Sequence, residues 1–149
     1  MPGFEEIVGH KEVIRHLQNA IRLGKVSHAY IFSGETGCGK KLLATAFAMT
    51  LQCEQRGGDP CLTCSSCKKA MSKNHPDIIH ITHEKPNSIG IEDIRSQLID
   101  DVAIKPYCSS YKIYFIRAAE NLTLQAQHAL RKTIEEPPAY AVILLLTNN

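Results

Sequence analysis

The residues best suited to chemistry lie in a glycine-rich stretch, residues 33–47, which reads SGETGCGKKLLATAF. Glycines at positions 34, 37 and 39 let a backbone fold tightly and turn its N–H groups toward one point, and Lys40 places a positive charge beside them. An apolar strand-like segment precedes the stretch and a helix-like segment follows it. This order and the spacing G-x-x-x-x-G-K are typical of a phosphate-binding loop at a helix N-terminus. An ordinary glycine-rich turn is the alternative.

The position after Lys40 departs from this pattern. It holds Lys41, where a Ser or Thr hydroxyl normally ligates Mg²⁺. An ammonium group repels a cation, although it is able to contact a phosphate directly. The predicted nucleotide contacts of this stretch are Gly34, Glu35, Thr36, Gly37, Cys38, Gly39, Lys40 and Lys41.

A second departure follows the apolar segment KIYFI, residues 112–116. ATPases with such a loop carry an Asp for Mg²⁺ at the end of a neighbouring strand, and many add a Glu that activates water. This chain has Arg117 and Ala118 there, and Glu120 is expected to be a surface or helix-start residue. The sequence therefore predicts weak binding of ATP or ADP, no catalytic residues and no intrinsic ATPase activity.

Four of the six cysteines form a separate candidate site. Their spacing is C-x7-C-x2-C-x2-C, and a closed set of four thiolates is typical of structural zinc. We predict a zinc-binding insert at residues 53–67, with an iron–sulfur cluster or free thiols as alternatives. The predicted ligands are Cys53, Cys61, Cys64 and Cys67.

Composition indicates a single domain over residues 1–149. A net charge of +2 is too small to indicate nucleic-acid binding by itself. The longest apolar run, AVILLL from Ala141, is too short to span a membrane, and the acidic N-terminus is unlike a signal peptide. We therefore expect a cytoplasmic protein with no membrane partner.

Strand and helix signals alternate along the chain. Helices are expected near residues 12–24, 39–52, 90–104 and 122–136, and strands near residues 28–34, 77–82, 112–117 and 140–147. This alternation predicts an α/β fold, with a parallel sheet covered by helices on both faces.

Several segments together resemble a known family. The stretches IVGHKEVIRHLQNAI, HAYIFSGETGCGKK and KIYFI, the four-cysteine insert, and HALRKTIEEPP followed by ILLLTNN are similar to bacterial DNA polymerase III clamp-loader subunits of the AAA+ class. The resemblance implies an AAA+ P-loop fold with an inserted zinc module, and it places Thr147 at the sensor position of the nucleotide site. It also implies that the AAA+ domain is truncated at its C-terminal end, before the arginine finger, lid and collar.

Within that family, the departures resemble the delta-prime type of subunit, which assembles without hydrolysing ATP. The resemblance implies the delta and gamma/tau subunits as partners, with the sliding clamp and primer-template DNA reached through the complex of the DNA polymerase holoenzyme. The alternatives are an active motor ATPase of the gamma/tau type and a small-molecule kinase with a zinc module.

Overall fold

Four apolar segments form one parallel sheet, as the sequence predicts. The computed structural model describes residues 3–4, 7, 9–35, 39–55 and 57–148. The strands are β1 (Ala29–Ser33), β2 (Ile78–His80), β3 (Lys112–Ile116) and β4 (Ala141–Thr147). Their order in the sheet is β1-β4-β3-β2, and all three pairings are parallel. The carboxyl ends of all four strands therefore lie at one edge of the sheet, which we call the carboxyl edge.

The two central strands are buried on both faces, which explains their continuous apolar runs. In β3, Ile113 and Phe115 join the core on one face, while Tyr114 and Ile116 join the core on the other. Side chains of β4 alternate between the same two cores. This alternation fixes the register, because a slip of one residue would exchange the two faces.

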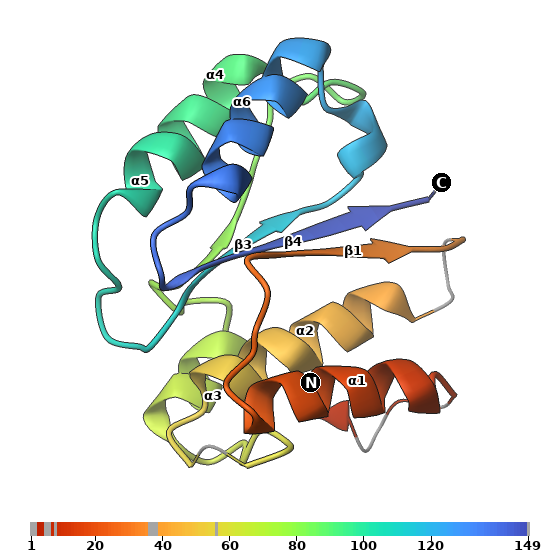
Figure 1. The fold of residues 1–149 in the computed structure, drawn as a ribbon, viewed down its shortest axis with the longest axis vertical. Helices are drawn as coiled ribbons and strands as arrows, with labels where there is room; N and C mark the ends of the chain where they lie inside the picture. The colour runs from red at the N-terminus through yellow and green to blue at the C-terminus, as the bar shows by residue number, and fades with distance from the viewer. Residues whose placement is uncertain (1–2, 5–6, 8, 36–38, 56, 149) are drawn as a thin grey trace.

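Helices cover both faces of the sheet (Figure 1). On one face lie α1 (Lys11–Arg22), α2 (Lys40–Gln52) and α3 (Ser65–Met71). On the other lie α4 (Ile91–Ile94), α5 (Asp100–Val102) and α6 (Leu124–Glu135), with the π-helical turn η2 (Arg95–Ile99) joining α4 to α5. No helix in the described ranges is both long enough and apolar enough to cross a membrane.

Two features of the helices differ from the sequence prediction. The helix expected at residues 90–104 is divided into α4, the π turn η2 and α5, and its residues Ile94, Leu98 and Val102 are all buried. Helix α3 was not predicted, because its buried side is made by a cysteine and a serine and not by an apolar stripe.

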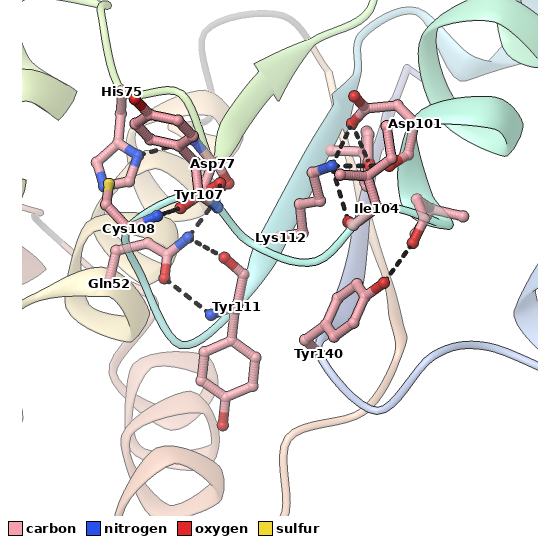
Figure 2. A network of polar contacts seen from close by, with 12 residues as sticks. Gln52, His75, Asp77, Asp101, Ile104, Tyr107, Cys108, Tyr111, Lys112 and Tyr140 are labelled. Carbon is pink, nitrogen blue, oxygen red and sulfur yellow. Dashed lines mark hydrogen bonds and ion pairs between the residues drawn. The ribbon is translucent and has the colours of Figure 1, made fainter.

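A buried carboxylate organises the edge of the sheet where the strands begin. Asp77, just before β2, is fully buried, and its two carboxylate oxygens accept the backbone N–H groups of Tyr107, Cys108 and Ser109 at 2.6, 2.7 and 2.9 Å. Beside it, the Gln52 amide donates to the Tyr111 carbonyl at 2.6 Å and accepts the Tyr111 N–H at 3.2 Å. Figure 2 shows contacts of both residues, which hold the loop before β3 against the start of β2 and the end of α2.

A second buried polar group, the Lys112 ammonium, links β3 to α5 on the other face of the sheet. Lys112, at the start of β3, is 4% exposed and donates to the carbonyls of Asp101 and Ile104 at the end of α5. It also pairs with the Asp101 carboxylate at 3.0 Å (Figure 2). The charge is thus surrounded by acceptors, which a buried cation requires, and it closes the last turn of α5.

The Asp77 contacts lead to a prediction about stability. Asp77→Ala leaves three backbone N–H groups without their acceptor, and we expect it to lower the free energy of unfolding by about 3 kcal/mol. Asp77→Asn should lie between this variant and the wild type, because the amide keeps one acceptor oxygen. Urea unfolding of the reduced protein measures the effect. The exposed Asp100→Ala is the control, and equal midpoints for Asp77→Ala and Asp100→Ala would contradict the role given to Asp77.

Candidate functional site

Lys40 lies at the carboxyl edge, but it contacts the protein itself. Its ammonium group donates to the carbonyls of Gly34 and Thr147 at 2.5 and 2.9 Å and to the side-chain oxygen of Asn148. The lysine therefore joins the start of the glycine-rich loop to the end of β4. A phosphate at this site would have to share the ammonium with these acceptors.

The predicted loop residues are placed in part. Gly34 continues the sheet by donating its N–H to Thr147 at 3.2 Å, and Glu35 is exposed. Gly39 has φ +90° at the start of α2, a conformation that an L residue adopts only with strain. Thr36, Gly37 and Cys38 lie outside the described residues.

Two positive residues occupy the positions at which an ATPase has residues that ligate Mg²⁺. Lys41 is in the first turn of α2, and Arg117 directly follows β3; both side chains are exposed. The Arg117 charge is the largest of the influences that lower the pKa of Lys41, ahead of burial and Lys73. The next residue, Ala118, carries no polar group. This corner of the site therefore repels a divalent cation instead of binding one.

Glu120 is the acidic residue whose position the sequence did not reveal. Ala118 has a left-handed backbone (φ +54°), after which the chain turns into the 3₁₀ helix η3 (Ala119–Asn121). This turn brings Glu120 Oε1 to 2.9 Å from the Thr147 hydroxyl and 3.3 Å from the Asn148 N–H. Glu120 is exposed, as expected, yet it contacts the predicted sensor residue. The sequence pattern does not predict the positive φ at Ala118, which precedes this contact.

The environment of Glu120 keeps it ionised. Its own backbone N–H has the largest effect in lowering its pKa, and the Thr147 hydroxyl follows; the Asn148 N–H and the Lys40 charge contribute further. The carboxylate is thus held by Thr147 and Asn148 on the β4 side of the edge. The exposed guanidinium of Arg117 takes the strand-end position that a metal-binding Asp would need.

The four predicted cysteine ligands come together in the insert. The Sγ atoms of Cys53, Cys61, Cys64 and Cys67 all lie within 4.8 Å of one another, and none of these cysteines forms a disulfide. Cys53 and Cys67 are buried, whereas Cys61 and Cys64 are half-buried. Four thiols this close together fit a tetrahedral zinc site.

Backbone N–H groups point at these sulfur atoms. Cys61 N donates to Cys53 Sγ at 3.4 Å, Cys64 N to Cys61 Sγ at 3.2 Å, and Cys67 N to Cys64 Sγ at 3.4 Å. Hydrogen bonds from Thr63, together with those from Cys64, lower the pKa of the Cys61 thiol to about 6, while burial raises the pKa of Cys67. N–H groups aimed at sulfur favour thiolates, the form that binds metal.

A second group of potential ligands, His75, Asp77 and Cys108, also lies within 4.8 Å. Its polar atoms are already engaged. Asp77 accepts three backbone N–H groups, and the His75 ring nitrogens contact Asp77 N at 3.0 Å, Ser66 Oγ at 3.0 Å and Ser109 Oγ at 3.1 Å. His75 therefore links α3 to the loop before β3.

Comparisons with known proteins agree with the fold. Residues 9–149 match the protein family described as "DNA polymerase III, delta subunit". The DNA polymerase III subunit tau of Bacillus subtilis (strain 168) is 39% identical over 145 residues, which are 97% of this chain and 25% of that protein. The subunit tau of Escherichia coli (strain K12) is 35% identical over 147 residues, or 98% of this chain and 22% of that protein.

A solved structure is also similar. The crystal structure of a DNA polymerase III gamma subunit-related protein from Thermotoga maritima has a TM-score of 0.58 and 25% identity, and the match covers 89% of this chain and 39% of that chain. The chain spans about a quarter of the length of the two tau subunits.

The contacts of Lys40 and Lys41 lead to opposite predictions for two neighbouring lysines. Lys40→Met removes three hydrogen bonds that join the start of α2 to Gly34, Thr147 and Asn148. We expect it to lower the free energy of unfolding by about 1–2 kcal/mol. Lys41→Met removes a charge repelled by Arg117 and should leave stability unchanged or slightly higher. Thermal unfolding without nucleotide measures both variants. A larger loss from Lys41→Met than from Lys40→Met would contradict this geometry.

Proposed function

The chain belongs to the protein family described as DNA polymerase III, delta subunit, and on that premise we propose that it is a clamp-loader subunit that assembles with its partners without hydrolysing ATP. The observation that supports the proposal most strongly is that Lys41 and Arg117 occupy the two positions at which an ATPase has its Mg²⁺ ligands. Phosphoryl transfer from ATP depends on positioning and on charge stabilisation around that ion. Two positive groups at this position repel Mg²⁺, which the reaction requires.

The site lacks the residue that orients the attacking water as well as the metal ligands. Ala118 replaces the carboxylate that orients the attacking water, and each such group contributes roughly a hundredfold or more to a rate. Lys40 and the loop glycines remain, so weak contact with ATP or ADP is retained, with Thr147 at the sensor position. This combination corresponds to the delta-prime type of subunit.

The proposed partners follow from that role. They are the delta and gamma/tau subunits of the same loader, with the sliding clamp and primer-template DNA engaged through the complex in the cytoplasm. In the assembly, the subunit would present the surface around its nucleotide site to its partners, and it would not hydrolyse ATP.

A motor subunit of the gamma/tau type is the second candidate, and one observation favours it. Glu120 contacts Thr147 and carries a negative charge near Lys40, so an acid is present at the edge even though the usual positions lack one. In this alternative Glu120 would replace the missing carboxylates. Arg117 argues against it, because its charge would compete with any metal that Glu120 bound.

Steady-state ATP turnover by the full-length protein with Mg²⁺ separates the two candidates. We expect no turnover above the level of Lys40→Ala, and we expect Lys41→Thr alone to stay inactive because the strand-end positions remain without acids. If the wild type turns over ATP and both Lys40→Ala and Glu120→Gln abolish it, the protein is a motor subunit and our proposal is wrong.

We also propose that the insert binds one structural Zn²⁺ through Cys53, Cys61, Cys64 and Cys67. The bound ion would supply cross-linking between the end of α2 and the start of α3, with no position left open for catalysis. The gathered sulfur atoms and the N–H groups aimed at them support this proposal.

Metal content and local stability test the zinc proposal together. Cys64→Ser should reduce zinc from about one ion per chain to near zero and speed hydrogen exchange over residues 53–73, while the parallel sheet stays protected. Serine is a good N-cap, so loss of α3 would reflect the metal and not the cap. Cys108→Ser is the matched control and should keep its zinc. Freshly purified, reduced wild type that contains no zinc would contradict the proposal.

A further inference from the structure

Two of the four clustered cysteines directly follow a buried polar residue. Gln52 precedes Cys53 at the end of α2, and Ser66 precedes Cys67 in α3. Gln52 is 4% exposed and Ser66 is 6% exposed. Both residues lie on hydrogen-bonded paths to the segment before β3, residues 105–111, which we call the β3 loop.

The first path is direct. The Gln52 amide donates to the carbonyls of Tyr111 and Asp77 at 2.6 and 3.2 Å, and its oxygen accepts the Tyr111 N–H at 3.2 Å. A buried side chain whose two amide ends are both bonded to backbone moves only if these bonds break. The position of Cys53, one residue along the chain, is therefore linked to the end of the β3 loop.

The second path runs through His75, which is 5% exposed. Its Nδ1 atom accepts the Asp77 N–H at 3.0 Å, so the other ring nitrogen, Nε2, carries the hydrogen. Nε2 lies 3.0 Å from the Ser66 Oγ and 3.1 Å from the Ser109 Oγ. The ring therefore bridges the serine beside Cys67 to the middle of the β3 loop.

The β3 loop has few apolar anchors of its own. No large side chain of residues 105–110 is buried, and that of Tyr107 is 84% exposed. Figure 2 shows that polar side chains from outside the loop, those of Gln52, His75 and Asp77, converge on it instead. Segments with few buried apolar contacts open most readily. The loop should therefore respond when one of these polar side chains loses its place.

We propose that the β3 loop is ordered by zinc binding at the four cysteines, and that Gln52 and His75 are the positioning residues that transmit the effect. The inference rests on the proposed zinc site and goes beyond it, because the loop is not part of the insert. Fixing Cys53 and Cys67 also fixes the polar residue before each of them, and both paths are then in place. At the surface, the exposed Tyr107 ring is held in one position only in the zinc-bound protein.

Amide hydrogen exchange of the full-length, reduced protein tests the proposal, with mass spectrometry of the peptide that covers the β3 loop. The zinc-loaded protein is compared with protein from which a chelator has removed the metal. We expect exchange over residues 105–111 to be about tenfold faster without zinc, a usual size for coupling between two sites. Exchange in β4 should stay unchanged.

The variant His75→Asn distinguishes transmission from a merely structural role. Asparagine keeps an acceptor near the Asp77 N–H, but it is too short to reach Ser66 and Ser109. We expect the variant to retain about one zinc ion per chain, while the effect of zinc on loop exchange falls from about tenfold to about twofold. His128→Asn, the same substitution at an exposed position of α6, is the matched control and should keep the full effect.

Reciprocity between coupled sites gives a second measurement. His75→Asn should raise the Kd for Zn²⁺, measured by competition with a chelator, by the factor lost from the exchange effect, about fivefold. A tenfold zinc effect that survives in His75→Asn would overturn the transmission through His75. Wild type that binds zinc but shows equal loop exchange with and without it would overturn the inference and leave the zinc site standing. Wild type that binds no zinc would overturn the zinc proposal and this inference with it.

Discussion

The parallel direction of all four strands is the constraint on which the site depends. With β4 between β1 and β3, Gly34 at the start of the glycine-rich loop lies beside Thr147, while Arg117 follows β3 and His80 ends β2 at the same edge. Ligands of open α/β sheets bind at such an edge. The residue types found there therefore determine what the site does, and in this chain Lys41 and Arg117 make the metal corner positive while Glu120 is directed to β4.

Helix α2 connects this edge to the cysteine insert. It begins at Lys40, beside the loop, and ends at Gln52, directly before Cys53. Gln52 pairs with Tyr111, and His75 joins Ser66 of α3 to the loop that Asp77 holds. A metal bound by the four cysteines would thus stabilise the far end of the helix that begins beside the glycine-rich loop.

Much of this could be predicted from the sequence, and the exceptions have physical causes. The parallel sheet, its covered faces and the family follow from periodic apolar runs and short motifs, because buried strands and amphipathic helices leave strong patterns. The proximity of the four cysteines follows from their spacing. The contact of Glu120 with Thr147 joins two segments that are far apart in the sequence, and it follows a left-handed Ala118. Tertiary contacts of this kind have no local signature.

The most direct test of the central claim restores what the site lacks. The claim is that ATP hydrolysis is absent because two Mg²⁺ ligands and the residue that orients the attacking water have been replaced, and not because the fold is unsuitable. The measurement is Mg²⁺-dependent ATP turnover by the triple variant Lys41→Thr, Arg117→Asp, Ala118→Glu in the reconstituted clamp loader, with the other subunits made inactive. The account predicts turnover by the triple variant and none by the wild type. Equal turnover by the two proteins would contradict it.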